Sequence, residues 1–268
     1  MGEGRTIRGA GDVIVRAVDV GKVFVDERGS AREALAGVDL DVVAGQFLSI
    51  IGPSGCGKST LLRILGGLST PTTGEVDCSP SATGRTAFVF QDHSLFPWLR
   101  VVDNAAFGLR MLGVPRAERR ARALGWLERL GLASFANAWP DELSGGMRQR
   151  LSLARALVTE PVLLLMDEPL GALDPQTRLV IQQDLARLFE QTGITMVMVT
   201  HSLEEALLLG DRVVAMTARP GRIAHVLEVA LPRPRTEAVM DTSAFGELRH
   251  ELWTHLEREV RATIGGTP

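Results

Sequence analysis

The chain of 268 residues has a formal net charge of −3, with 45% hydrophobic and 23% charged residues. This is the composition of an ordinary globular protein, and it lacks the basic excess typical of a nucleic-acid partner. Two cysteines are too few for a disulfide framework and indicate a reducing compartment. The longest apolar runs, 162–166 and 194–199, are much shorter than the ~20 residues of a membrane-spanning helix. We therefore expect a soluble protein that reaches a membrane only through a partner.

Hydrophobic periodicity in the first part of the chain predicts strands and helices around one glycine-rich loop. Residues 1–12, rich in glycine and arginine, predict a flexible leader. The elements predicted after this leader are strands at 13–20, 37–42 and 46–51, a helix at 58–66 and a strand at 87–90. From 103 to about 157 the periodicity is helical. Pro115 and Pro140 divide this stretch, because the residue before a proline leaves the helical region.

The second part of the chain alternates apolar strands with helices. The predicted elements are strands at 162–166, 194–200, 212–216 and 223–229, and helices at 175–191 and 203–209. This rhythm predicts a parallel sheet covered on both faces. Pro232 and Pro234 mark a linker before a final amphipathic helix at 245–264. The predicted organisation is a leader over 1–12, one α/β domain over 13–235 with a helical subdomain at about 92–157, and a C-terminal helical extension over 236–268.

The segment from Gly52 to Thr60 reads GPSGCGKST and fits the phosphate-binding pattern G-x-x-x-x-G-K-[ST] in full. An apolar strand precedes it and a helix follows, as the pattern requires. Glycines let backbone N–H groups turn inward around phosphates, and Lys58 would reach the β- and γ-phosphates. Ser59 would bind Mg²⁺, and Thr60 a phosphate oxygen. The predicted phosphate-binding residues are Gly52, Pro53, Ser54, Gly55, Cys56, Gly57, Lys58, Ser59 and Thr60. The alternative is a glycine-rich turn that binds nothing.

Cys56 fills a position of this loop that needs a small residue. It stands close to the predicted start of the helix at 58–66, and a helix N-terminus tends to lower the pKa of a thiol. We therefore expect Cys56 to be a plausible target for thiol reagents.

Two acids end the apolar strand at 162–166. Asp167 at the tip of the strand would bind Mg²⁺ directly or through water, and Glu168 would polarise an attacking water molecule. Solvated carboxylates at a strand end are the alternative. Their place downstream of a phosphate-binding loop favours the catalytic interpretation.

The run Leu143-Ser-Gly-Gly-Met147 resembles the signature motif of ABC ATPases. A serine and paired glycines at a helix N-terminus form an anion site. The resemblance implies that Ser144, Gly145 and Gly146 bind the γ-phosphate of a nucleotide held by the opposite subunit. Ser144 would also cap the helix that follows, which is compatible with the first role.

Three further segments resemble motifs of the same family, in the same order. Gln91 resembles the glutamine that contacts Mg²⁺ and the water. Gly171–Asp174 resembles the loop that crosses the dimer interface, with Asp174 beside the nucleotide. His201 resembles the histidine that contacts the γ-phosphate. The resemblance implies a P-loop NTPase fold of the α/β class, with a RecA-like, mostly parallel sheet, an antiparallel N-terminal β part and a helical subdomain. It also implies ATP and Mg²⁺ as cofactors, metal contacts from Ser59, Gln91 and Asp167, catalytic roles for Glu168, His201 and Gln91, and a head-to-tail homodimer.

The chain departs from the family in having no tyrosine to stack on adenine. Phe24 is the nearest aromatic residue at a suitable position before the phosphate-binding loop. Stacking on it would contribute roughly 1–3 kcal/mol. The alternative is a phenylalanine of the core.

Phe96-Pro-Trp-Leu99 lies shortly after Gln91, where transporters of the family receive a helix of the membrane subunit. Docking and packing within the helical subdomain remain equal alternatives for this cluster. The run SLFPWLRVVDNAAFGL and the tail around Trp253 are most similar to ATPases of nitrate, sulfonate and taurine importers. That similarity implies a permease partner, an indirect solute-binding partner, and a peripheral position on the cytoplasmic face of the cell membrane.

Four other functions stay open at this point: a soluble ABC ATPase without a transport role, an importer for another solute, a small-molecule kinase, and a non-catalytic regulator. The short spacing from Gln91 to Ser144 leaves no room for the coiled coil of DNA-repair ATPases, and a kinase has no use for the 143–147 motif. Intact Glu168 and His201 argue against a non-catalytic protein.

Overall fold

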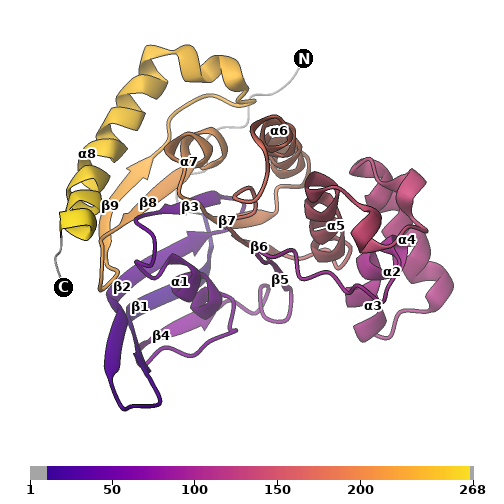
Figure 1. The fold of residues 1–268 in the computed structure, drawn as a ribbon, viewed down its shortest axis with the longest axis horizontal. Helices are drawn as coiled ribbons and strands as arrows, with labels where there is room; N and C mark the ends of the chain where they lie inside the picture. Colours follow the sequence, from indigo (N-terminus) through magenta and orange to yellow (C-terminus); the bar gives the residue numbers. More distant parts are fainter. Residues whose placement is uncertain (1–10, 266–268) are drawn as a thin grey trace.

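The computed structural model describes residues 11–265 of the chain. Residues 1–10, which form most of the predicted leader, lie outside the described part, as do the last three residues. The described chain forms two β-sheets, with helices beside the larger one and a separate group of helices at one end of the molecule (Figure 1).

The smaller sheet is antiparallel, with the strand order β2–β1–β4. Its strands are β1 (Val13–Val25), β2 (Ala31–Val43) and β4 (Thr73–Cys78). The predicted strands at 13–20 and 37–42 cover only the half of the β1–β2 hairpin whose side chains alternate between buried and exposed. In the rest the residues next to the turn, 24–25 and 31–33, are exposed, although the backbone stays paired as far as Val25 and Ala31. Strand β4 was not predicted from the sequence, because nearly all its residues are exposed.

The larger sheet has six strands in the order β5-β6-β7-β3-β8-β9. These are β5 (Thr86–Val89), β6 (Leu163–Asp167), β7 (Thr195–Val199), β3 (Phe47–Ile51), β8 (Arg212–Met216) and β9 (Ile223–Glu228). All neighbours pair in parallel except β8 and β9, which are antiparallel. Strands β3, β6 and β7 are fully buried, as their uninterrupted apolar runs predict. The predicted mostly parallel sheet is confirmed, as is the antiparallel N-terminal β part.

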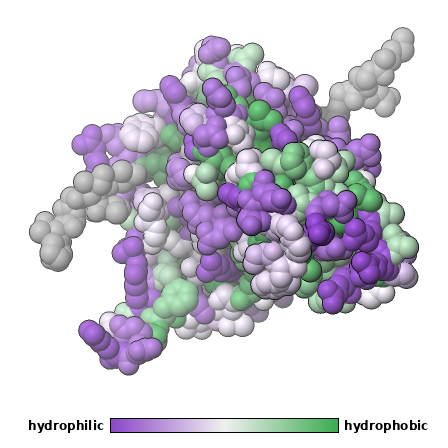
Figure 2. All heavy atoms as spheres, turned by 45° about the vertical axis from the view of Figure 1, so that its right-hand side comes forward, coloured by the Kyte–Doolittle hydropathy of each residue, from purple (hydrophilic) through white to green (hydrophobic). Residues whose placement is uncertain are grey.

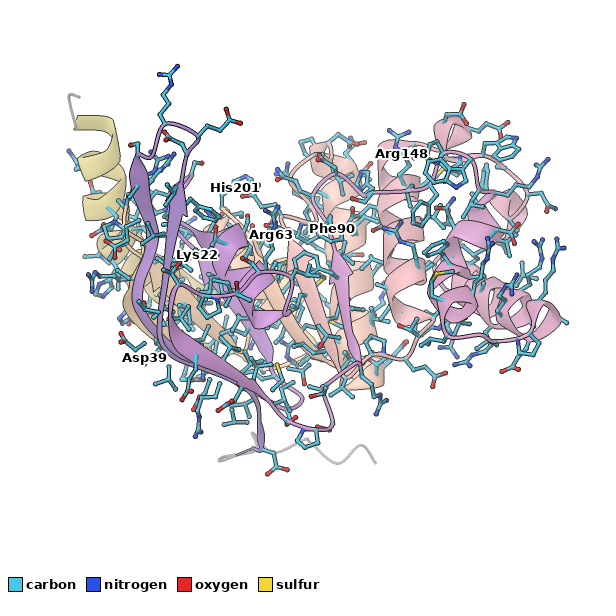
Figure 3. All side chains as sticks on the ribbon, turned by 90° about the horizontal axis from the view of Figure 1, so that it is seen from below. Lys22, Asp39, Arg63, Phe90, Arg148 and His201 are labelled. Atoms are coloured by element: carbon cyan, nitrogen blue, oxygen red, sulfur yellow. The ribbon has the colours of Figure 1, made fainter. Side chains whose placement is uncertain are left out.

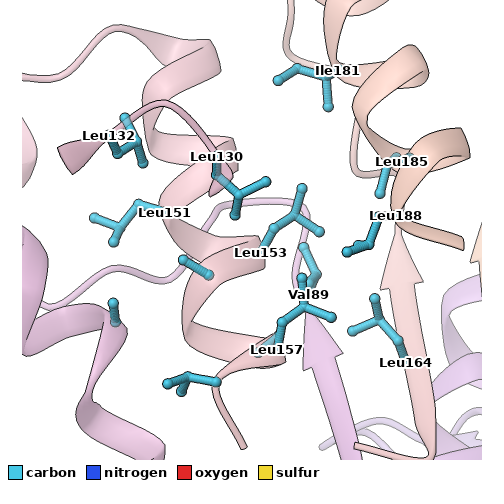
Figure 4. Close-up of a cluster of buried hydrophobic side chains, with 14 of the residues drawn as sticks. Val89, Leu130, Leu132, Leu151, Leu153, Leu157, Leu164, Ile181, Leu185 and Leu188 are labelled. Atoms are coloured by element: carbon cyan, nitrogen blue, oxygen red, sulfur yellow. The ribbon is translucent and has the colours of Figure 1, made fainter. Parts of the chain in front are cut away.

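Helices gather in two places around the sheets. Those beside the large sheet are α1 (Lys58–Leu65), α6 (Pro175–Thr192), α7 (Leu203–Leu209) and α8 (Ser243–Gly265). Those at the far end, beyond β5, are α2 (Val101–Ala105), α3 (Phe107–Met111), α4 (Arg116–Arg129) and α5 (Gly145–Leu157) (Figure 1). Short 3₁₀ turns span Ala133–Phe135, Pro140–Glu142 and Glu237–Asp241. Figure 4 shows how α5 joins the far group to the sheet: its leucines pack against Val89 of β5, Leu164 of β6 and residues of α6.

Among the described residues, no helix is both long and apolar enough to cross a membrane. Hydrophilic residues cover most of the face seen in Figure 2, and hydrophobic residues appear there as separate patches.

Helix α8 packs on the sheet through Phe245, Leu252 and Leu256. The buried guanidinium of Arg235 fixes the segment that leads into this helix. It donates hydrogen bonds to the backbone carbonyls of Leu207, Gly210, Val229 and Leu231. Burial lowers the pKa of Arg235 to about 10. A single side chain thus ties the end of α7 to the segments that follow β9.

We expect Arg235→Met to lower the free energy of unfolding by about 2–5 kcal/mol, because several buried carbonyls would lose their donor. Urea unfolding followed by circular dichroism measures this loss. Arg187→Met, on the exposed face of α6, is the matched control and should change stability by no more than about 0.5 kcal/mol. Similar losses from both variants would contradict the role given to Arg235.

Candidate functional site

The carboxyl ends of β3, β6 and β7 meet at one edge of the sheet, since the three strands are parallel neighbours. The phosphate-binding loop leaves β3 at this edge, Asp167 and Glu168 end β6 there, and His201 follows β7. Two backbone hydrogen bonds align the strand ends, from Glu168 N–H to Val199 O (3.0 Å) and from Thr200 N–H to Ile50 O (3.1 Å). Figure 3 shows His201 on the side of the sheet where the strands end. Ligands of open parallel sheets bind at this edge.

The loop from Gly52 to Gly57 curls around the ammonium group of Lys58. Lys58 Nζ donates to Gly52 O (2.8 Å) and Pro53 O (3.0 Å), so the cation lies inside the loop. Gly57 has a φ of 103°, and a Cβ there would lie 2.8 Å from the Ala34 carbonyl oxygen. Only glycine fits this position. Loop and lysine together form a cationic concavity suited to phosphate.

Ser59 and Asp167 are joined by a hydrogen bond of 2.7 Å from the serine hydroxyl to Asp167 Oδ1. Asp167 is buried, and burial raises the pKa of its carboxyl group. A hydroxyl and a carboxylate side by side are oxygen ligands of the kind that Mg²⁺ prefers, usually with phosphate oxygens and water completing the shell. No cluster of three or more His, Cys, Asp or Glu side chains within the described chain could hold a metal alone. The donor set therefore fits Mg²⁺ bound together with a nucleotide.

Two of the predicted catalytic side chains approach one oxygen atom of the third, Glu168. Gln91 Nε2 donates to Glu168 Oε2 at 3.3 Å, and His201 Nδ1 lies 3.6 Å from the same oxygen. The backbone of Glu168 has a φ of 45°, in the left-handed region that residues other than glycine rarely adopt. Such strain persists where the surrounding structure imposes it, and it is concentrated at functional sites.

A cavity of about 560 Å³ runs from Phe24 to Glu168 along the phosphate-binding loop. Its volume lies within the range of small-molecule sites. Phe24 is about half exposed at one end, with Lys22 Nζ 5.3 Å from the centre of its ring. Gln91 and Glu168 line the other end. Phe24 is thus a surface residue facing the cavity, and the alternative of a core phenylalanine is wrong.

Arg219 is a cavity residue that sequence reasoning missed. It lies between β8 and β9, and its Nε donates to the Gly55 carbonyl at 3.1 Å across the phosphate-binding loop. Arg32 also lines the cavity. Neither arginine belongs to a local motif, because the fold brings both to the loop from distant segments.

Ser144, Gly145, Gly146 and Asp174 do not line this cavity. Ser144 caps α5 by accepting from Met147 N–H (3.3 Å), as the capping interpretation predicts. Asp174 caps α6 by accepting from Thr177 N–H (3.0 Å). Hydrogen bonds from the side chain and then from the backbone of Thr177 lower the pKa of Asp174. The two caps are neighbours, since a Cβ on Gly146 would lie 2.3 Å from Thr177 Cγ2. Within one chain they form a second, separate and exposed surface.

The expected reactivity of Cys56 is wrong. Its side chain is only 1% exposed, and burial raises the pKa of the thiol. The predicted effect of the helix N-terminus is outweighed because the thiol packs inside the loop, where a Cβ on Gly52 would lie 2.9 Å from its sulfur.

The sheet, the loop and the paired acids define a P-loop nucleotide hydrolase. The sequence model of the family described as "ABC transporter" matches residues 35–171. The chain is 48% identical over 226 residues to an aliphatic sulfonates import ATP-binding protein of Agrobacterium fabrum, covering 84% of this chain and 79% of that protein. It is 41% identical over 257 residues, 94% of each chain, to an uncharacterised ABC transporter ATP-binding protein of Methanocaldococcus jannaschii. The chain belongs to the ABC transporter family.

Solved structures agree with this assignment. The dimeric structure of MJ0796, a bacterial ABC transporter cassette, superposes with a TM-score of 0.70 at 35% identity, covering 81% of this chain and all of the cassette. A second structure of that cassette holds ADP and Pi after hydrolysis, with the same score and coverage. The present chain is an ATP-binding subunit and an ATPase, with ATP and Mg²⁺ as its cofactors.

We expect the Cys78 thiol of the folded protein to react readily with a thiol reagent and the Cys56 thiol to react at least about a hundredfold more slowly. Cys78 is exposed on β4, whereas Cys56 becomes accessible only when the loop opens. Absorbance of released thionitrobenzoate follows both phases. Cys78→Ser should remove the fast phase alone, and two thiols reacting at one rate would contradict the buried position of Cys56.

Proposed function

We propose that the chain is the ATPase subunit of an importer for a small organic anion of the sulfonate class. The relatives named as aliphatic sulfonate importers support this solute class, with identities of 47–50% over about three quarters or more of the chain. The subunit would act on the cytoplasmic face of the cell membrane, docked on a permease that receives solute from a binding protein. In this proposal 13–235 is the catalytic domain, with a helical subdomain at about 92–157, and 236–268 is an extension.

The observation that carries the proposal is the separation of two half-sites on one chain. One half-site is the cavity with Lys58, Ser59, Asp167 and Glu168. The other is the surface at the N-termini of α5 and α6, where Ser144 and Asp174 are exposed and Gly146 is buried against Thr177. Two copies arranged head-to-tail would bring the second half-site of each copy to the cavity of the other. Two nucleotides would then be enclosed between the copies.

Each side chain of the first half-site has a distinct role in this proposal. Lys58 binds the terminal phosphates, and Ser59 and Asp167 would hold Mg²⁺, which would neutralise charge on the phosphate oxygens. Glu168 accepts a proton from the attacking water. Gln91 and His201, both beside Glu168 Oε2, orient that water and the γ-phosphate. Phe24 stacks on the base, and Arg219 supports the loop from outside.

In this proposal the segment Phe96–Leu99 forms a docking surface for the permease. Phe96 packs on Phe107, with ring centres 4.3 Å apart, and the buried Asn104 side chain holds the segment through bonds to Phe96 N–H (2.9 Å) and Leu99 O (2.7 Å). Trp98 remains 70% exposed on this rigid segment. The alternatives of docking and internal packing therefore apply to different residues. Phe96 packs within the helical group, and Trp98 is free to contact a partner.

We expect Glu168→Gln to bind MgATP with wild-type affinity but to lower turnover by roughly 10²–10⁴-fold, because a positioned base is lost. The variant should also form a stable dimer when ATP is present. Phosphate release measures turnover, and sedimentation velocity measures the dimer. Glu160→Gln is the matched control, since Glu160 also has a positive φ (52°) but lies on the surface beside Arg122. Wild-type turnover in Glu168→Gln would remove Glu168 from the proposed role.

A further inference from the structure

A second cavity of about 770 Å³ lies beside the phosphate-binding loop, between this loop and α8. Pro53, Ser54 and His201 line one side of it, and Arg249, His250 and Trp253 of α8 line the other. Ser54 lines both this cavity and the nucleotide cavity, so the two adjoin at the tip of the loop. The family model matches 35–171 and does not include α8, which begins at Ser243. The cavity thus combines the catalytic edge of the sheet with an element outside the matched region.

The lining has the composition of a protein interface. Trp253 is 46% exposed, although Leu252 and Leu256 on the same helix are buried against the sheet. Arg249 Nη1 lies 3.9 Å from Glu204 Oε1, so the positive charge of Arg249 is nearly balanced by the negative charge of Glu204. A balanced charge gives no preference for a small anion. Tryptophan and arginine beside apolar side chains are typical of the energetic centre of protein interfaces.

A second copy of this chain carries a surface that complements the cavity. Leu179 and Val180 are exposed apolar residues in the first turns of α6, at 38% and 45% exposure. Thr177 in the same turns packs on Gly146 beside Ser144. Any copy that brings its Ser144 to the phosphate-binding loop therefore brings the start of its α6 close to the same loop.

We propose that the cavity between the phosphate-binding loop and α8 receives the start of α6 from a second copy of the chain. Trp253 would pack against the exposed apolar residues Leu179 and Val180 of that copy. Helix α8 would thereby extend the dimer interface beyond the nucleotide. His201 lines the same cavity, so the proposed contact would adjoin the catalytic edge of the sheet. This inference rests on the proposed head-to-tail dimer.

The first test measures dimer affinity in the Glu168→Gln background with MgATP, by sedimentation equilibrium. Trp253→Ala should weaken the dimer by roughly ten- to a hundredfold, the usual effect of losing an interface tryptophan. The nucleotide affinity of the monomer should not change, since Trp253 lies outside the nucleotide cavity. Val226→Ala on β9 is the matched control, with 45% exposure, and should leave the dimer unaffected.

The outcomes separate the two proposals. If Glu168→Gln forms an ATP-dependent dimer of equal affinity with and without Trp253, the role of α8 is overturned while the shared nucleotide site stands. The cavity would then serve another occupant, such as a small effector. If Glu168→Gln with intact Trp253 forms no dimer, the proposed function fails and the inference fails with it.

Cross-linking supplies a second measurement, which reports proximity; the protein concentration is raised about a hundredfold to offset the weaker dimer expected without the Trp253 side chain. In a Cys78→Ser background, Trp253→Cys is placed on one copy and Val180→Cys on the other, and a short bis-maleimide is added. We expect covalent dimers from this mixture with MgATP and few without nucleotide. Val226→Cys paired with Val180→Cys is the control and should give few dimers in either condition. Equal yields from both pairs would overturn the proposed contact.

Discussion

The shared edge of β3, β6 and β7 is the constraint on which the rest of the site depends. Parallel strands end at the same edge, so a loop, a pair of acids and a histidine from distant parts of the chain meet there. The bond between Ser59 and Asp167 joins residues 108 positions apart and fixes α1 against the end of β6. Burial holds the carboxyl group of Asp167 away from water and raises its pKa. The deprotonated carboxylate is therefore disfavoured on its own, and a bound cation would stabilise it.

The chain carries two surfaces, and neither forms a complete nucleotide site alone. The cavity beside Lys58 has cationic and acidic groups but is open toward solvent. The helix caps Ser144 and Asp174 do not line the nucleotide cavity of their own chain. Their separation gives a physical reason for a dimer, because neither surface alone encloses a nucleotide. Excluding water strengthens every electrostatic contact to the phosphates. Helix α8, with Trp253 beside the same loop, would add contact area where the two copies close.

Most of this arrangement could be predicted from local patterns in the sequence. The phosphate-binding loop, the acids after β6 and the histidine after β7 each carry a sequence signal, because uninterrupted apolar strands precede them. Strand β4 and the outer half of the β1–β2 hairpin carry no such signal, since exposed strands lack hydrophobic alternation. Arg219 and the burial of Cys56 depend on contacts between distant segments. The cavity under α8 depends on how a helix docks, which its amphipathic pattern does not specify.

Complementation between two defective variants tests the shared site most directly. Lys58→Ala disables the cavity half-site and Ser144→Arg the capping half-site, so neither variant alone should hydrolyse ATP. In a mixed dimer, one site combines the intact Lys58 of one copy with the intact Ser144 of the other. Random pairing should therefore restore up to about a quarter of wild-type activity on mixing. A mixture as inactive as its components, or full activity from either variant alone, would contradict a nucleotide site built from two chains.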